Sequence, residues 1–266
     1  MQNLTVLVVG ATGSIGRLVV AEALQNGHVV RALVRNEAQA RRHLPAAAQI
    51  VIGDVTQPAT LVDAVADVDA IVLTLGSEGG GKVGAEAIDY GGVRNVLAAI
   101  GTATPRIALM TAIGVTNRTG AYNRSTEAHD WKRRAERLVR ASGLAYTIVR
   151  PGWFDANRPD QRHLELLQGD TRQAGDPSDG VVSRAQIAQI LVASVSSAAA
   201  RNKTFELVAL SGPAQIDLDP LFAALDSDSP TALDAVRAAA NMPLADEPQR
   251  VRDDLAAVVQ RHTVAG

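Results

Sequence analysis

The sequence predicts an α/β protein built on a doubly wound parallel sheet, with a small, mostly helical C-terminal extension on the substrate side. Short runs of Val, Leu and Ile, which are typical of buried strands, alternate along most of the chain with segments of helical apolar spacing. This alternation indicates successive β-α-β units, whose strands are parallel. The first unit is the most specific, because a strand at 4–9 runs directly into a turn with three glycines and then into a helix.

The other elements follow the same alternation. We predict strands at 4–9, 28–35, 49–55, 70–76, 106–112, 146–154 and 203–210. After the helix of the first unit, helices are expected at 37–44, 58–66, 85–100, 128–141, 184–198, 217–226, 231–240 and 248–262, with a short one near 161–168. Loops at 76–84, 113–127 and 153–180 would border a substrate pocket, because ligands of such sheets bind at the carboxyl ends of the strands.

Composition excludes several classes of function. The chain has 266 residues, 47% of them hydrophobic, which is enough for a large core, and a net charge of −2. A charge so close to neutral gives no electrostatic reason to expect nucleic acid or an anionic membrane as a partner. The lack of cysteine excludes disulfides, thiolate metal sites and cysteine nucleophiles. We expect no metal, no leader segment and no membrane span, and therefore a cytoplasmic protein with a small-molecule substrate.

The glycine turn is typical of a dinucleotide phosphate site. Gly10 can turn where a side chain would clash, Gly13 lets backbone N–H groups approach a pyrophosphate, and Gly16 lets the helix pack closely on the strand. The helix N-terminus adds unpaired N–H groups and a partial positive charge. The residues predicted to bind the phosphates are Gly10, Thr12, Gly13, Ser14, Ile15 and Gly16.

The ends of the later strands predict which dinucleotide binds. The second strand ends in Arg35 instead of the Asp or Glu that usually accepts ribose hydroxyls in enzymes preferring NAD, and an arginine fork can pair with a 2′-phosphate. We therefore predict NADP(H), with an ordinary surface arginine as the alternative and Arg31 as a second cation that could assist. Asp54 could accept a hydrogen bond from the adenine amino group. Further predicted cofactor contacts are Val55, Thr74, Leu75, Gly76, Thr111, Pro151, Gly152 and Trp153.

Several short motifs together resemble the atypical short-chain dehydrogenase/reductases, the NAD(P)-binding group that includes NmrA-like and flavin/biliverdin-reductase-like proteins. The resemblance spans roughly residues 4–210 and is carried by residues 10–17, 32–35, 53–55, 131–136, 142–152 and 182–184. It implies a Rossmann fold, a bound NADP(H), and a pocket over the nicotinamide formed by the segments after strands four, five and six. Residues 1–155 would form the dinucleotide-binding core, and 156–266 the substrate-side loops, the last strand and the C-terminal helices, packed on the same domain.

One departure from the family pattern concerns catalysis. The resemblance places Lys132 where the family's lysine holds the nicotinamide ribose, but the residue four positions earlier is Ala128 instead of the tyrosine that delivers a proton. Thr111 stands in the place of the partner serine. The proton-relay trio of the family is thus incomplete, and the resemblance supports dinucleotide binding more strongly than alcohol dehydrogenation.

Two functions stay open on these residues. The first is an NADP(H)-dependent reductase of a quinone, flavin or similar conjugated or carbonyl acceptor, with Thr111, Tyr122 or His129 polarising the substrate. The second is a non-catalytic NADP(H)-sensing regulatory protein of the NmrA-like type, which the missing tyrosine favours. A sugar epimerase or dehydratase needs a strong acid–base pair, and Ala128 argues against it.

Each candidate catalytic residue also has a plain structural interpretation. Tyr122 lies in a segment expected to be an exposed polar loop, and His129, beside an aspartate at a helix start, would be solvated. Lys132 is followed by Arg133 and Arg134 and would then be one of several surface cations.

Overall fold

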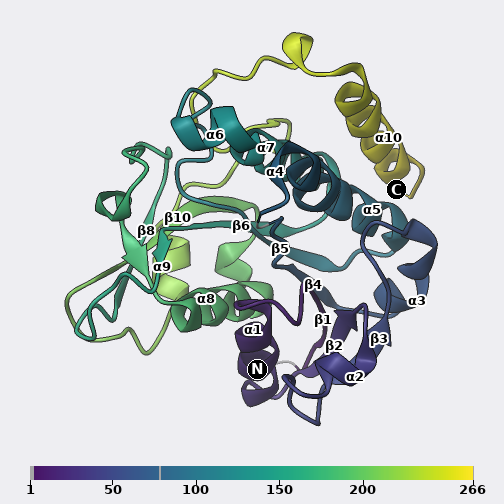
Figure 1. Cartoon of the computed structure of the whole chain (residues 1–266), viewed down its shortest axis with the longest axis horizontal. Coiled ribbons are helices and arrows are strands. Elements are labelled where there is room, and N and C mark those ends of the chain that lie inside the picture. Colours follow the sequence, from purple (N-terminus) through teal and green to yellow (C-terminus); the bar gives the residue numbers. More distant parts are fainter. Residues whose placement is uncertain (1–2, 78, 266) are drawn as a thin grey trace.

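Eight strands form one sheet in the order β3-β2-β1-β4-β5-β6-β10-β8 (Figure 1). The computed structural model describes residues 3–77 and 79–265. The strands are β1 (Thr5–Val9), β2 (Val29–Val34), β3 (Gln49–Ile52), β4 (Ala70–Leu73), β5 (Arg106–Met110), β6 (Tyr146–Pro151), β8 (His163–Leu167) and β10 (Lys203–Leu210). All neighbouring strands are parallel except β8, which runs antiparallel to β10. The doubly wound parallel sheet is confirmed, and every predicted strand is present.

Helices cover both faces of this sheet (Figure 1). On one face lie α1 (Gly16–Gln25), α2 (Glu37–Ala40), α8 (Arg184–Ser196) and α9 (Asp219–Ala223), and on the other α3 (Val62–Val65), α5 (Gly91–Ile100), α7 (Ala128–Ala141) and α10 (Gln249–Ala265). Alternate residues of β1 serve the two cores: Val6 and Val8 belong to the first, Leu7 and Val9 to the second. Because both faces are covered, a central strand is apolar throughout instead of alternating with polar residues.

Several helices are shorter than the sequence pattern predicts. The segment 37–44 is helical only over α2, 58–66 is divided into a 3₁₀ turn (Pro58–Thr60) and α3, and 217–226 retains only α9. Helices of one or two turns gain little from local hydrogen bonding, so tertiary contacts decide their length. Within the described part of the chain, no helix combines the length and the apolar composition that crossing a bilayer requires.

Two segments that were predicted as loops are partly helical. The loop after β4 contains α4 (Gly81–Gly84), and the loop after β5 contains α6 (Ala121–Thr126). These two short helices pack against each other, which explains why the sequence pattern alone does not indicate them. The helix expected at 85–100 begins as a π-helical turn, η2 (Ala85–Tyr90), and continues as α5. Glu78, in the first of these loops, lies outside the described residues.

The prediction of a short helix near 161–168 is wrong, because this segment forms β8. Polar and apolar residues alternate through His163, Leu164 and Glu165, and Leu164 is buried. Such alternation is a strand pattern, and the free edge of β10 offers backbone partners to an extended segment. A second, two-stranded sheet of β7 (Trp153–Phe154) and β9 (Val181–Val182) lies just beyond the end of β6.

The helix predicted at 231–240 is also wrong, since this segment is irregular. Its carbonyl groups accept hydrogen bonds from arginines of α7: Arg140 Nη1 donates to Leu233 O at 3.3 Å and Arg133 Nη2 to Ala239 O at 2.6 Å. A helix would use the same carbonyls for its own N–H groups. The alanine-rich composition therefore favours a helix locally, and the contacts with α7 override it.

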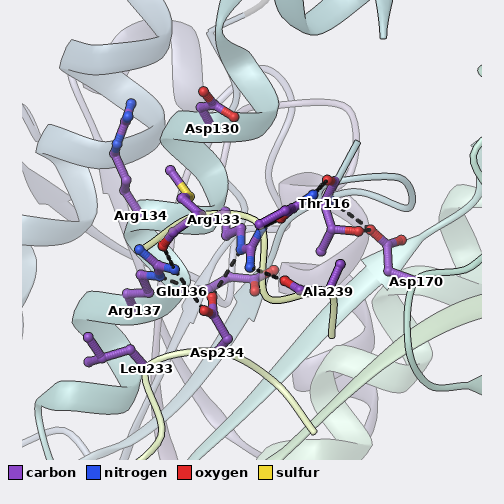
Figure 2. A network of polar contacts seen from close by, with 12 residues as sticks. Thr116, Asp130, Arg133, Arg134, Glu136, Arg137, Asp170, Leu233, Asp234 and Ala239 are labelled. Atoms are coloured by element: carbon purple, nitrogen blue, oxygen red, sulfur yellow. Dashed lines mark hydrogen bonds and ion pairs between the residues drawn. The ribbon is translucent and has the colours of Figure 1, made fainter. Parts of the chain in front are cut away.

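The arginines of α7 are buried and bind the C-terminal segment, residues 231–247 (Figure 2). Arg133 and Arg137 both pair with Asp234, at 3.0 and 2.7 Å. Arg134 pairs with Glu247 at 2.6 Å. The side chain of Arg133 is only 1% exposed, so the interpretation of Arg133 and Arg134 as surface cations is wrong. Charges buried in this way need partners, and Asp234 in the irregular segment and Glu247 beyond it supply them.

Candidate cofactor and substrate site

The glycine turn after β1 is so tight that two of its glycines cannot carry a side chain. Gly10 has a φ of +86°, and a Cβ atom there would lie 2.9 Å from the carbonyl and hydroxyl oxygens of Thr74. A Cβ on Gly16 would lie 2.1 Å from the carbonyl oxygen of Gly10. Gly13 is less restricted, because its Cβ would lie 3.2 Å from the same oxygen. The sharp turn at Gly10 and the close packing at Gly16 are therefore present as predicted.

The outer side of this turn fits the phosphates of a dinucleotide. Thr12, Gly13 and Ser14 are exposed, whereas Ile15 and Gly16 are buried. The first turn of α1 contains no acidic residue that would compete with an anion. An accessible helix start of this kind binds phosphate through its free N–H groups and its partial positive charge.

Arg184 brings a cation to the same turn. Its Nε donates a hydrogen bond to Ser14 Oγ at 3.2 Å, and its guanidinium also pairs with Asp155. A pocket of about 670 Å³ lies beside the turn, and Arg17 and Arg184 are among the residues that line it. In the sequence Arg184 stands out only as part of a family motif, because no local pattern reveals a contact across 170 positions.

Arg35 and Asp54 lie at the carboxyl ends of β2 and β3. Arg35 is exposed, and its guanidinium has no hydrogen-bond or ion-pair partner among the described residues. Asp54 Oδ1 accepts hydrogen bonds from the backbone N and the hydroxyl of Thr56, at 2.9 and 2.8 Å. The backbone bond above all, with help from the Arg35 charge, lowers the pKa of Asp54 and keeps it a carboxylate. The carbonyl of Val55 is fixed by Asn95, whose Nδ2 donates to it at 2.7 Å.

Thr74, Leu75 and Gly76 lead away from the end of β4. The Thr74 hydroxyl donates to Val9 O at 3.0 Å, so its proton is not available to a ligand. Leu75 is buried, whereas Gly76 is exposed and a Cβ there would meet nothing within 4 Å. Of the three predicted contacts, Gly76 therefore offers the most open surface.

The chain turns sharply at the end of β6. Gly152 N donates to Leu207 O at 2.9 Å, and a Cβ on Gly152 would lie 2.5 Å from the carbonyl oxygen of Gly180. Pro151 is the last residue of β6, and Trp153, 42% exposed, begins β7. The predicted turn at Pro151 and Gly152 is present, and it leaves the Trp153 indole accessible.

Lys132 is not a surface lysine. Its Nζ donates to Asp89 Oδ1 at 2.6 Å, and Ser77 Oγ donates to the other carboxylate oxygen of Asp89 at 2.5 Å. The Lys132 side chain is 15% exposed and that of Asp89 only 1%. Neither Asp89 nor Ser77 is among the predicted site residues. The one signal in the sequence is an aspartate within an otherwise largely apolar helical segment, which does not reveal its partner.

Thr111 belongs to a buried ion cluster. Its hydroxyl donates to Glu136 Oε1 at 2.8 Å, and Arg150 donates to both oxygens of the same carboxylate, at 2.9 and 2.7 Å. Burial alone would raise the pKa of Glu136, but Arg150, Arg140 and the Thr111 bond together lower it to about 2. The Thr111 hydroxyl thus donates its proton to a carboxylate that stays ionised. Toward a ligand, the hydroxyl oxygen can therefore only accept a hydrogen bond.

Tyr122 and His129 lie side by side. Their ring centroids are 5.1 Å apart, and Tyr122, on α6, is 57% exposed. His129 is not the solvated residue that a helix start suggests, because burial lowers the pKa of its imidazole and favours the neutral form. Its Nδ1 is buried and has no hydrogen-bond partner within the described ranges.

Asp170 fixes the loop after β5, a role that sequence reasoning missed. It is buried, and its carboxylate accepts hydrogen bonds from Gly114 N at 2.6 Å and from the N and hydroxyl of Thr116, both at 2.7 Å. The Asp170 N donates in turn to Glu206 Oε2 at 3.1 Å. Burial raises the pKa of Glu206 to about 7, with Arg150 opposing the rise and Asp170 adding to it.

Known proteins are similar to this chain in sequence or in fold. The uncharacterised sugar epimerase YhfK of Bacillus subtilis is 30% identical over 208 residues, which cover 76% of this chain and 92% of that protein. The chloroplastic divinyl chlorophyllide a 8-vinyl-reductase of Zea mays is 38% identical over 162 residues, 56% of this chain and 40% of that protein. A structure of a short-chain dehydrogenase/reductase from Veillonella parvula in complex with NADP superposes with a TM-score of 0.59 at 17% identity, covering 78% of this chain and 95% of that one.

The segment that contains the candidate site also identifies the family. Residues 10–198 match the family described as NAD(P)H-binding, a range that starts at the glycine turn and includes α7 and α8. This match confirms the predicted resemblance and a nicotinamide dinucleotide as the cofactor class. The accessible glycine turn and the strand ends beside it fit such a cofactor. The chain therefore belongs to the NAD(P)H-binding family of atypical short-chain dehydrogenase/reductases.

Proposed function

We propose that the protein uses NADP(H) to reduce a small conjugated or carbonyl acceptor, such as a quinone or a flavin. The observation that carries this proposal is an accessible glycine turn beside an exposed, unpartnered Arg35 at the end of β2, both within the described residues. A guanidinium at this position suits the 2′-phosphate that distinguishes NADP from NAD. The reductase among the relatives supports the class of reaction and favours it over a purely regulatory role.

The cofactor would supply the hydride, and the residues of the chain would bind and orient the reactants. The Lys132 ammonium has three donors, of which Asp89 takes one, so two remain for hydroxyls of the nicotinamide ribose. The neutral imidazole of His129 and the hydroxyl of Tyr122 are the groups we propose to contact the acceptor. Thr111 would contribute only hydrogen-bond acceptance, because its proton is held by Glu136.

The absence of a tyrosine at position 128 restricts the substrate class. Ala128 is buried and offers no proton, which is why we propose acceptors that can collect their proton from water or from a neighbouring neutral acid. A sugar epimerase, the activity in the name of the Bacillus subtilis relative, needs an acid–base pair at this place, and we do not propose it for this chain.

The proposal is tested by mixing the purified protein and NADPH with a panel of quinones, flavins and aldehydes and following the absorbance of NADPH. We expect oxidation with at least one acceptor and none with Gly13→Val, whose side chain would occupy the phosphate turn. Tight NADPH binding without oxidation across the panel would contradict the reductase and support the sensor. Failure of the wild-type chain to bind NADPH would contradict both.

A further inference from the structure

A buried carboxylate joins two parts of the site that are far apart in sequence. Asp89 accepts hydrogen bonds from Lys132 Nζ at 2.6 Å and from Ser77 Oγ at 2.5 Å, one on each oxygen. We propose that Asp89 is a positioning residue that, together with Ser77, directs the Lys132 ammonium at the nicotinamide ribose of the bound cofactor. This inference rests on the proposed function, because it assigns the residues that hold the reactive half of the same cofactor.

The three residues come from elements that meet at the carboxyl end of the sheet. Ser77 lies just beyond the end of β4, Asp89 lies on the π-helical turn η2, and Lys132 lies on α7. Short π-helical turns are rare and occur frequently at functional sites, where the extra residue redirects a side chain. The turn packs directly on α7, so the aspartate reaches the lysine without a long, flexible side chain.

The packing beside this pair makes it rigid. Tyr90 and Trp131, the immediate neighbours of Asp89 and Lys132, have ring centroids 5.4 Å apart. The Tyr90 hydroxyl also donates to Asp254 on α10 at 2.8 Å. The aspartate and the lysine are therefore held at a fixed separation by the residues next to them, which is what a positioning role requires.

The hydrogen-bond inventory of the cluster matches a vicinal diol. Asp89 uses one of the three donors of the Lys132 ammonium and leaves two. The Ser77 proton is directed at Asp89, so its oxygen presents only lone pairs to a ligand. Ribose hydroxyls both accept and donate, and they can satisfy the lysine donors and the serine acceptor together. The nicotinamide carboxamide fits less well than the ribose. Its NH2 group could donate to the Ser77 oxygen, but it has only one oxygen to accept from the two free donors of Lys132.

A purely structural ion pair would not need this arrangement. Burying a charged pair gives little net stability, and an apolar pair of similar volume often serves the fold as well. The Lys132 side chain is 15% exposed and that of Asp89 only 1%, so a ligand can reach the lysine of this pair but not the aspartate. The Asp89 carboxylate, at 2.6 Å, is the group that fixes the Lys132 ammonium.

The test compares two ligands by calorimetric titration. NADPH contains the nicotinamide ribose, whereas adenosine 2′,5′-bisphosphate contains the adenosine half with its 2′-phosphate and lacks that ribose. An asparagine at 89 is uncharged and has an NH2 group in place of one of the two oxygens that Lys132 and Ser77 use. We therefore expect Asp89→Asn to weaken NADPH by about 10- to 100-fold and to change the bisphosphate less than about twofold. Lys132→Met should cause a similar loss, and the double variant should bind NADPH no more weakly than Lys132→Met alone.

The matched control is Glu86→Gln on the same π-helical turn. Glu86 pairs with Arg250 at 2.7 Å, and both side chains are largely exposed, so neither ligand should bind differently. Equal losses for both ligands in Asp89→Asn, or no loss for either, would overturn the positioning role. Failure of the wild-type protein to bind NADPH would overturn the proposed function as well, and the two failures are therefore distinguishable.

A second variant carries the test if Asp89→Asn does not fold. Ser77→Ala removes the hydroxyl but keeps the ion pair, and we expect about a 3- to 10-fold loss of NADPH affinity with unchanged bisphosphate affinity. Unchanged NADPH affinity in Ser77→Ala would contradict the inference.

Discussion

Arg137 binds Asp234 through two parallel hydrogen bonds, Nε to Oδ1 at 3.0 Å and Nη2 to Oδ2 at 2.7 Å. Arg133 Nε donates to the same Oδ1 at 3.0 Å, so one carboxylate of the C-terminal segment pairs with two buried guanidinium groups of α7 (Figure 2). Because α7 also carries Lys132, the C-terminal segment supports the helix that presents the candidate ribose-binding lysine.

Asp234→Ala should destabilise the protein strongly. The variant leaves the buried Arg133 and Arg137 without their carboxylate, which is itself partly exposed. Removing one partner of a fully buried pair costs about 3 kcal/mol or more, so we expect a loss of about 2 to 3 kcal/mol here. Urea unfolding followed by circular dichroism measures the change. The control is Asp226→Ala, which removes an exposed pair with Arg237 and should cost less than about 1 kcal/mol. Equal losses in the two variants would contradict the role of the Asp234 carboxylate.

Glu206 should make the protein less stable as the pH rises through the weakly acidic range. Burial raises its pKa from 4.5 to about 7, so between these values the folded chain holds a proton that the unfolded chain has lost. By linkage, the contribution of the Glu206 proton to the free energy of unfolding is fully present below about pH 4.5 and decreases as the pH rises. It is lost above about pH 7, and the whole change is roughly 3 kcal/mol.

Glu206→Gln isolates this contribution, since glutamine does not titrate. The free energy of unfolding, measured in urea at about pH 5 and about pH 8, should fall between the two conditions by roughly 2.5 kcal/mol more in the wild type than in the variant. Other titrating groups affect both proteins and cancel in the comparison. An identical pH dependence in the two proteins would show that Glu206 is ionised over the whole range.

The sequence is sufficient to predict the sheet and the glycine turn because both follow from local pattern. A buried parallel strand is a continuous apolar run, and Gly10 and Gly16 stand where strand, turn and helix require them. The same local reasoning fails at the irregular segment 231–240, where helix propensity is high but the arginines of α7 take the backbone carbonyls. Propensity is a weak preference that tertiary contacts override.

The parts of the site that were missed depend on contacts between distant positions. Asp89 reaches Lys132 across 43 positions, and Asp170 reaches Gly114 across 56. Each is an ordinary aspartate in the sequence, and only the fold shows that both are buried and that each binds two partners. Charged residues on a helix are usually solvated, so an interpretation of α7 from sequence places its arginines on the surface.

Gly13→Val and Gly16→Ala should separate cofactor binding from folding. At Gly13 an added Cβ lies 3.2 Å from Gly10 O on the exposed side, so we expect the fold to persist and NADPH affinity to fall by about 100-fold or more. At Gly16 the added Cβ lies 2.1 Å from the same backbone oxygen, so the alanine should lower the unfolding temperature. Titration and thermal unfolding give the two readouts, and unchanged NADPH affinity in Gly13→Val would remove the phosphate turn from the site.

Arg35→Ala should convert the cofactor preference without disturbing the fold. Arg35 is exposed and has no hydrogen-bond or ion-pair partner in the described chain, so its removal breaks no internal contact. A lost charge-assisted bond to the 2′-phosphate should weaken NADPH by about 10- to 100-fold and leave NADH within about twofold. The control is Arg31→Ala. The sequence offers Arg31 as a second cation for the 2′-phosphate, but its guanidinium donates to Ala66 O instead, so we expect its removal to favour neither cofactor. Calorimetric titration measures both affinities, and equal losses of NADPH and NADH in Arg35→Ala would refute the 2′-phosphate role.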